Sequence, residues 1–407
     1  MQSRRAFLAA SFAAPAVLMG KKTYTYAEVE KLLAKGDVKG KLSREDLPTP
    51  ALVLDLDAFE ANVAKMTGLM RERKRALRPH AKTHKCADIA NYLIKQGAVG
   101  ACAAKISEAE ALAAGGVTGL LITSSMVGRQ RIERAIRLAQ KRPETIFCVD
   151  NAQNARDLND AAGAARLKLN VAIDLWVSGR TGIKPGDPAV GLAEQIAQLS
   201  NLKFHGIQAY AGQASHVVGF EARKKLSHEV MAAAVETRRT IESKGISAPW
   251  LSGGSTGTYN IDSEIDGITE IQPGSFMFMD VDYNRIGGAD GDAVYRDFKN
   301  SLTVLTTVIS KPSDEIAIVD GGFKAFATDR QFGPALKGDD SIPYNFAGDE
   351  HGRLNLAKAS RAVNLGDRLE FIIPHCDPTV NLYDNIYGTR GDNVECVWRV
   401  HARGRTQ

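Results

Sequence analysis

Short apolar segments alternate with amphipathic segments between about residue 50 and residue 290, and this alternation constrains the fold most strongly. Helical patterns lie between the apolar segments, for example at residues 58–73, 129–141 and 221–243. Strands that alternate with helices form parallel sheets, and about eight such units predict a closed (β/α)8 barrel over residues 47–290. An open doubly wound sheet would fit the same periodicity. The expected strands are residues 51–56, 76–80, 100–104, 119–123, 145–149, 167–174, 203–210 and 248–252.

The pattern changes after residue 290, where helical segments become rare. Residues 301–309, 315–319, 367–373, 381–387 and 393–400 are typical of strands. We therefore expect a C-terminal β domain over residues 291–407, with residues 22–46 packing near it.

The first 20 residues have the features of an export signal. Arg4 and Arg5 precede an apolar run that ends at Met19 and is short for a membrane span. The arginine pair predicts the twin-arginine export route, hence a periplasmic protein without stable membrane insertion. The cleavage point stays open, because Ala14 and Ala16 lie inside the apolar run.

Charge and cysteine content exclude other classes of protein. The net charge is +5, and the basic residues are scattered among acidic ones, so we expect no nucleic-acid partner. Five cysteines are an odd number and lie far apart in the sequence, which argues against a disulfide framework.

Residues 77–85, Leu-Arg-Pro-His-Ala-Lys-Thr-His-Lys, contain the most informative motif of the chain. The segment places Lys82 and Lys85 at the exit of a predicted strand. Side chains at the carboxyl ends of barrel strands face the ligand crevice, where a desolvated lysine can act as an amine nucleophile. A basic surface loop is the alternative interpretation.

A second candidate segment follows the last predicted barrel strand. Residues 252–258, Ser-Gly-Gly-Ser-Thr-Gly-Thr, combine small residues with hydroxyl groups, so that backbone N–H groups can approach a phosphate closely. Arg180 follows an earlier strand in a Gly-rich turn. Tyr210 could donate to the phosphate, and His216 could act as a general base.

A third candidate lies in the predicted β domain, where His375 and Asp377 flank Cys376. Two residues apart on an extended chain, they would point the same way and could share a divalent cation, with Cys376 on the opposite face. Two protein ligands would leave coordination positions for water or substrate.

Together these segments resemble the metal-dependent, pyridoxal-phosphate enzymes of the D-threonine aldolase and D-serine dehydratase group, which have an alanine-racemase-like barrel followed by a β domain. The similarity runs from residues 47–55, Leu-Pro-Thr-Pro-Ala-Leu-Val-Leu-Asp, to Ala402-Arg403-Gly404. It covers nearly the whole chain after the export segment. A homodimer is also implied, with the β domain of one chain closing the barrel mouth of the other.

The resemblance implies a role for each candidate residue. Lys82 would be the Schiff-base lysine, with Lys85 a neighbour, and His216 the acid/base catalyst. His375 and Asp377 would bind manganese or zinc, with magnesium a further option. The pyridoxal phosphate would be held by Lys82, Arg180, Tyr210, Gly253, Gly254, Ser255, Thr256 and Gly257.

The implied reaction is cleavage of the Cα–Cβ bond of a β-hydroxy D-amino acid to glycine and an aldehyde. A D-serine or 3-hydroxyaspartate dehydratase, which eliminates water and releases a keto acid and ammonia, is the main alternative. A metal-independent racemase and a non-catalytic binding protein are further alternatives. The aldolases resemble this chain in having His-x-Asp at the metal, whereas the dehydratases have His-x-Cys. Ala211 stands where related aldolases often carry histidine, which leaves the substrate open.

Overall fold

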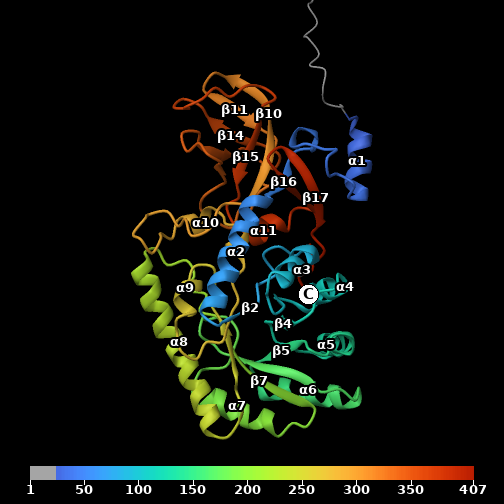
Figure 1. Ribbon diagram of the computed structural model, residues 1–407, viewed down its shortest axis with the longest axis vertical. Helices are drawn as coiled ribbons and strands as arrows, with labels where there is room; N and C mark the ends of the chain where they lie inside the picture. Colours follow the sequence, from blue (N-terminus) through green and yellow to red (C-terminus); the bar gives the residue numbers. More distant parts are fainter. Residues whose placement is uncertain (1–23) are drawn as a thin grey trace, which may run out of the picture.

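A barrel of eight parallel strands forms the lower part of the computed structural model, which describes residues 24–407 (Figure 1). The strand order is β2-β9-β8-β7-β6-β5-β4-β3. The two ends of this order meet, because the N–H groups of Val99 and Cys102 donate to the carbonyls of Leu77 and Pro79 at 2.8 and 2.9 Å. The barrel prediction is therefore confirmed, and the open sheet is excluded. The strands are β2 (Ala76–Leu77), β3 (Ala101–Ala103), β4 (Leu120–Ile122), β5 (Ile146–Val149), β6 (Leu169–Asp174), β7 (Leu202–Ala209), β8 (Trp250–Gly253) and β9 (Glu270–Ile271).

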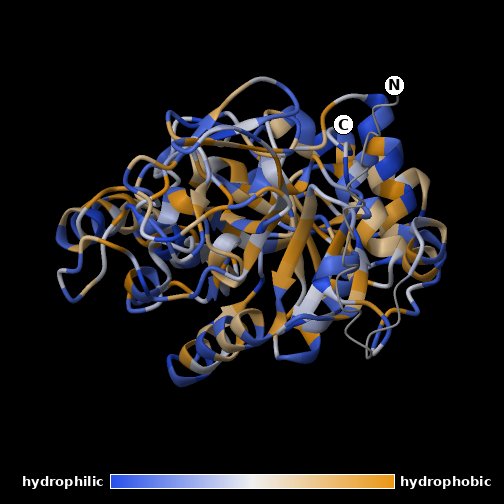
Figure 2. Ribbon diagram, turned by 90° about the horizontal axis from the view of Figure 1, so that it is seen from above, coloured by the Kyte–Doolittle hydropathy of each residue, from blue (hydrophilic) through white to orange (hydrophobic). Residues whose placement is uncertain are grey.

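Helices cover the barrel because each presents one apolar face to it. In α5 the buried residues Ile132, Ala135, Leu138 and Ala139 recur at helical spacing, and the remaining positions are largely charged. Apolar strands lie inside and polar helix faces lie outside (Figure 2). The helices are α2 (Leu56–Glu72), α3 (Ala87–Lys95), α4 (Ile106–Ala114), α5 (Arg129–Lys141), α6 (Ala152–Ala164), α7 (Asp187–Ala197), α8 (Phe220–Ser243) and α9 (Tyr259–Asp262).

The first predicted barrel strand belongs to the other sheet, so that prediction is wrong. Strand β1 (Ala51–Asp55) pairs antiparallel with β10 and parallel with β16. A short apolar run fits any buried strand, and its periodicity does not say which sheet it joins. The eighth barrel strand is instead β9, whose two residues are too few to produce an apolar run.

The β domain is a mixed sheet in the order β13-β14-β11-β10-β1-β16-β17, with β15 beside β10 and β12. Helix α1 (Tyr26–Lys35) and the residues up to Leu47 pack on it, where Val29, Val38 and Leu42 join one buried cluster with Val53 and Leu305. The strands are β10 (Leu302–Ser313), β11 (Ile316–Val319), β12 (Ala335–Leu336), β13 (Tyr344–Phe346), β14 (Gly352–Asn355), β15 (Arg368–Ile372), β16 (Asn385–Arg390) and β17 (Asn393–Arg399).

Two short helices join the β domain to the barrel mouth. The N–H groups of Val281 and Asp282 donate to the carbonyls of Ile373 and Pro374 at 3.0 and 3.2 Å. This contact places α10 (Val281–Asn284) against the segment that enters α11 (Cys376–Val380). The β domain therefore lies over the carboxyl ends of the early barrel strands (Figure 1).

The predicted export segment, residues 1–20, lies outside the described residues. Within residues 24–407, no helix has both the length and the apolar character needed to cross a bilayer.

Candidate active site

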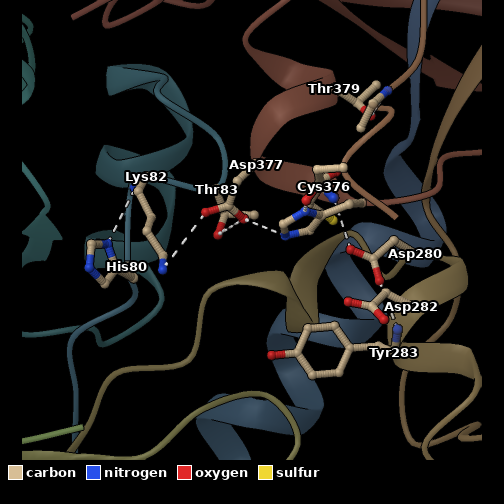
Figure 3. A network of polar contacts seen from close by, with 12 residues as sticks. His80, Lys82, Thr83, Asp280, Asp282, Tyr283, Cys376, Asp377 and Thr379 are labelled. Atoms are coloured by element: carbon tan, nitrogen blue, oxygen red, sulfur yellow. Dashed lines mark hydrogen bonds and ion pairs between the residues drawn. The ribbon is translucent and has the colours of Figure 1, made fainter. Parts of the chain in front are cut away.

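Lys82 lies in the mouth of the barrel, in the turn between β2 and α3. Its ammonium group points toward Asp377 of the β domain, with Nζ 3.9 Å from Oδ1 (Figure 3). The ring of Tyr210 lies 5.8 Å from the same nitrogen. Neighbouring Thr83 and His84 are buried. The segment is therefore an interior loop facing a cavity, and the alternative of a solvated basic surface loop is excluded.

Lys85 fixes the relation between Lys82 and Asp377. Its buried ammonium group donates to the backbone carbonyl of Lys82 and, at 2.9 Å, to that of Asp377. Burial lowers the pKa of Lys85. One side chain thus connects the barrel loop to the β domain through the backbone carbonyls of Lys82 and Asp377.

His375 and Asp377 converge, but by a different backbone route from the one expected. His375 is extended and caps α11, and Asp377 lies in the first helical turn, so the prediction of a continuous extended segment is wrong. His375 Nε2 and Asp377 Oδ2 are nevertheless 3.9 Å apart. Cys376 turns away and is buried, with Sγ 3.8 Å from the carbonyl oxygen of Met279.

Asp329 orients the imidazole of His375. His375 Nδ1 lies 2.8 Å from Asp329 Oδ2. A carboxylate on one ring nitrogen is the usual partner of a metal-binding histidine, because it leaves the other nitrogen free to bind the metal. This arrangement leaves Nε2 facing Asp377, so the residues present fit a divalent metal ion.

Opposing influences set the ionisation of Asp377. Burial alone would raise its pKa, but the positive charges of Lys82 and Lys85 outweigh burial and hold the pKa below its ordinary value. Thr83 Oγ1 donates to Asp377 Oδ2 at 3.3 Å. The carboxylate is therefore ionised at neutral pH, as a metal ligand must be.

Asp280 connects α10 to α11. One of its carboxylate oxygens accepts from the N–H of Tyr283 and the other from the N–H of Cys376, both at 2.9 Å (Figure 3). Burial raises the pKa of Asp280 to about 6, although these hydrogen bonds oppose the shift. This side chain holds the first turn of the helix that carries Asp377.

His216 faces the same cavity from the loop after β7. Its ring packs on Tyr283 with a centroid separation of 4.4 Å, and Nδ1 lies 3.3 Å from Asp282 Oδ2. Burial lowers the pKa of His216, with the charge of Asp282 opposing the shift. A neutral imidazole is the form that can accept a proton.

A cavity of about 200 Å³ brings most of the candidate residues together, being lined by Lys82, His216, Thr256, His375 and Asp377 among others. An adjoining cavity of about 290 Å³ shares Lys82 and Tyr210 with it and includes Arg180. A larger cavity of about 860 Å³ contains none of the residues predicted for catalysis or binding. The residues predicted for catalysis and binding therefore gather at the first two cavities and not at the cavity of about 860 Å³.

Arg180 and Tyr210 form a stacked pair at this site. The guanidinium of Arg180 lies 4.9 Å from the centre of the Tyr210 ring. The Tyr210 hydroxyl lies 3.3 Å from Ser215 Oγ. The structure thus brings both predicted cofactor contacts beside Lys82.

The glycine-rich loop after β8 meets the requirements of a phosphate site. A Cβ on Gly253 would lie 2.1 Å from the carbonyl oxygen of Ala209, and one on Gly257 would lie 2.0 Å from that of Ser215, so both glycines are required sterically. Thr256 Oγ1 is buried and has no hydrogen-bond partner within residues 24–407. The loop therefore offers an unpaired donor, which fits a phosphate group.

Sequence reasoning missed Asp329 and Arg330. Arg330 bridges Asp282 and Asp329 through two hydrogen bonds of 2.8 Å each. Both residues lie in an irregular loop, and nothing in the pattern around them distinguishes them from surface charges. The contact by which Asp280 holds α11 was missed as well.

Comparison with known proteins agrees with this geometry. Residues 54–282 match the family described as the alanine racemase N-terminal domain, and residues 301–389 match a putative serine dehydratase domain. A closed barrel with a lysine at its mouth and a β domain above it defines the alanine-racemase-like class. The chain belongs, more narrowly, to the family of alanine-racemase-like aldolases and dehydratases, which are lyases.

Three relatives illustrate the family. The chain is 36% identical to a 3-hydroxy-D-aspartate aldolase of Paracoccus denitrificans (strain Pd 1222), over 89% of this chain and 94% of the relative. It is 36% identical to the crystal structure of D-threonine aldolase from Filomicrobium marinum, with a TM-score of 0.84 over 91% of this chain and 99% of that one. D-threo-3-hydroxyaspartate dehydratase from Delftia sp. HT23 is 27% identical, with a TM-score of 0.79 over 88% and 98% of the two chains.

Proposed function

We propose that the protein is a pyridoxal-phosphate- and metal-dependent aldolase that cleaves the Cα–Cβ bond of a β-hydroxy D-amino acid into glycine and an aldehyde. The observation that carries this proposal is the convergence of one amine, one imidazole and one histidine–carboxylate pair on a single cavity: Lys82, His216, His375 and Asp377. The relatives' names point to small D-amino acids as substrates.

The barrel residues hold the cofactor. Lys82 would form the covalent link through its amine, Arg180 and Tyr210 would contact the cofactor, and Gly253 to Gly257 would bind the phosphate. Bound pyridoxal phosphate supplies an electron sink for the negative charge left on Cα when the Cα–Cβ bond breaks.

The β-domain residues would hold the metal. His375 and Asp377 would bind it, and a mixed imidazole and carboxylate set suits manganese or zinc. Such an ion would supply Lewis acidity toward the substrate β-hydroxyl, whose proton a weak base could then remove.

His216 is the base that removes the hydroxyl proton. The half-buried imidazole is neutral at the start of the reaction, because partial burial lowers its pKa. The electron pair of the O–H bond becomes the second bond of the aldehyde carbonyl, and the Cα–Cβ pair moves to Cα. A proton then returns to Cα to give glycine.

Asp377 favours the aldolase reaction over dehydration. Two solved structures of D-threo-3-hydroxyaspartate dehydratase are single-residue variants. In one a histidine is replaced by alanine. In the other, which is metal-free, the replaced residue is a cysteine two positions later. The same spacing in this chain joins His375 to an aspartate. A metal pair of this kind also argues against the racemase and the non-catalytic binding protein.

Product analysis with D-threonine and D-threo-3-hydroxyaspartate tests the proposal. Glycine with acetaldehyde or glyoxylate is the expected result from the manganese-loaded holoenzyme. Release of ammonia with a keto acid would instead assign the protein to the dehydratases. Lys82→Ala is the matched control, because it should abolish either reaction.

We propose that the protein is exported to the periplasm by the twin-arginine route. The support is the Arg4-Arg5 pair before the apolar run. Replacing both arginines with lysine should retain the protein in the cytoplasm on cell fractionation. A protein that still reaches the periplasm would contradict this route.

A homodimer is the proposed assembly, on the strength of the family resemblance. Sedimentation equilibrium of the holoenzyme should give twice the mass of one chain. A monomer mass at the concentration of full activity would contradict it.

A further inference from the structure

Arg223, in the first turn of α8, is a fully buried cation that the catalytic scheme does not yet use. All of its hydrogen bonds go to backbone carbonyls. Nε donates to Gly257 at 2.8 Å, one terminal nitrogen donates to Val217 and Ile286 at 2.8 Å each, and the other donates to Gly287 at 2.9 Å.

These four carbonyls come from three separate segments that form the candidate site. Gly257 closes the glycine-rich loop, and Val217 follows His216 directly. Ile286 and Gly287 follow α10, which carries Asp282 and Tyr283. Because one rigid guanidinium donates to all three segments, it fixes their positions relative to one another.

Within residues 24–407, Arg223 forms no ion pair. The negative charge of Asp297 acts on its guanidinium only from beyond ion-pair distance. The rings of Phe220 and Tyr295 lie 5.7 and 5.8 Å from the guanidinium carbon. Burial lowers the pKa of Arg223. A buried cation without a partner is costly, and a bound anion nearby would offset that cost.

The hydrogen bonds around Arg223 also orient the glycine-rich loop. The Tyr295 hydroxyl donates to the carbonyl of Thr256 at 2.9 Å, and Arg223 holds the next carbonyl, that of Gly257. The C=O and N–H of one planar trans peptide point in opposite directions, so the N–H of Gly257 faces away from Tyr295. In the described part of the chain, no group accepts a hydrogen bond from that N–H. A backbone donor of this kind requires a partner.

We propose that Arg223 is the positioning residue for the cofactor phosphate. Together with Tyr295, it holds the carbonyl side of the loop so that the opposite side presents the N–H of Gly257 and the Thr256 hydroxyl as donors, and its charge balances that of the phosphate dianion. This inference rests on the proposed function, because it assigns the phosphate of pyridoxal phosphate to residues 253–257.

Binding of two cofactor forms to the full-length protein freed of cofactor tests the role of Arg223. The dissociation constants of pyridoxal phosphate and of pyridoxal, which lacks the phosphate, are measured for the wild type and for Arg223→Gln. The substitution should weaken pyridoxal phosphate by at least about tenfold, as expected for lost hydrogen bonds to a charged group, and pyridoxal by less than about twofold. Arg223→Lys keeps the charge, so its dissociation constant for pyridoxal phosphate should lie between those of the wild type and Arg223→Gln.

Arg238→Gln is the matched control. Arg238 lies on the same helix and also donates to backbone carbonyls, those of Ala248 and Gly267, each at 2.6 Å. Neither carbonyl belongs to the glycine-rich loop, so the ratio of the two dissociation constants should equal that of the wild type.

Two outcomes would overturn the inference in distinguishable ways. Equal weakening of both cofactor forms in Arg223→Gln would make Arg223 a purely structural residue, while leaving the proposed function intact. A wild-type protein that does not prefer pyridoxal phosphate over pyridoxal would remove the phosphate site itself. If circular dichroism shows that Arg223→Gln does not fold, the ratio in Arg223→Lys decides the question.

Discussion

Three side chains form the surroundings of Lys82 at the barrel mouth: the carboxylate of Asp377, the ring of Tyr210 and a second lysine, Lys85. The nitrogen of Lys82 lies 3.9 Å from Asp377 and 5.8 Å from the ring of Tyr210, at the wall of the cavity of about 200 Å³. Lys85, three residues later, is buried with its nitrogen on the carbonyls of Lys82 and Asp377. One lysine is thus placed to react and the other to hold its position.

Lys82→Ala should abolish the visible absorbance that a lysine-bound cofactor shows, because no other lysine of residues 24–407 lines the cavity that holds His216, His375 and Asp377. The measurement is the absorption spectrum of the purified variant after incubation with pyridoxal phosphate. Lys95→Ala, which changes an exposed lysine in the last turn of α3, should keep the spectrum of the wild type. A wild-type spectrum in Lys82→Ala would assign the link to another lysine.

Asp262 should make stability depend on pH. Burial raises the pKa of Asp262 to about 6, although hydrogen bonds from Ser227 and Thr258 oppose the shift. The folded state therefore binds the proton more tightly than the unfolded state, whose carboxyl pKa is about 3.9. Stability is lost as the pH rises from about 4 through about 6, by an amount on the order of 2–3 kcal/mol.

Urea unfolding at several pH values checks this expectation. Asp262→Asn cannot ionise, so the wild type should lose stability relative to the variant over that pH window. Asp157→Asn, at an exposed position of α6, should follow the wild-type curve. Parallel curves for the wild type and Asp262→Asn would show that ionisation of Asp262 costs nothing.

Two short helices at the domain junction, α10 and α11, position His375 and Asp377. Helices of four or five residues are difficult to predict from sequence patterns. Asp280 caps α10 through Tyr283 and holds the first turn of α11 through Cys376. The pairing of His375 with Asp377 could be predicted, because two metal-ligand residues at close spacing are visible in the sequence. The helical turn that brings them together could not, since five residues are too few to show a helical period.

Asp280→Ala should weaken metal binding as well as stability. Loss of the cap costs about 1–2 kcal/mol, and a displaced α11 should lower manganese affinity about 10–100-fold. Isothermal titration of the holoenzyme with manganese measures the second effect. Asp55→Ala is the control, because Asp55 caps α2 through the N–H of Ala58 at 3.0 Å and makes no contact with the metal pair. Unchanged manganese affinity in Asp280→Ala would show that α11 keeps its position without the cap.

In the proposed function, the two domains of the molecule carry two different chemical tasks. The barrel carries Lys82, Tyr210 and the glycine-rich loop, whereas the β domain carries His375 and Asp377. The division into a barrel and a β domain could be predicted from the change of pattern after residue 290. The membership of β1 could not, because an apolar pentapeptide is equally suited to either sheet, and the pairing with β16 is a contact between residues more than three hundred positions apart.

Metal removal should therefore separate the two tasks. Dialysis of the holoenzyme against a chelator should abolish aldehyde formation while leaving the absorbance of the lysine-bound cofactor in place. Added manganese should restore activity, since the ligands are preformed by Asp329 and Asp280. Loss of the cofactor absorbance together with the metal would show that the two sites are not independent.

The position of β1 also sets the order in which the molecule can be completed during synthesis. Strand β1 emerges early from the ribosome, yet its two neighbours, β10 and β16, start at Leu302 and Asn385. For most of translation β1 has no partner, and the segment with His375 and Asp377 does not yet exist. A nascent chain can thus form much of the barrel that holds Lys82 before His375 and Asp377 have been made, so the proposed site can be completed only after the segment between β15 and β16 has been synthesised.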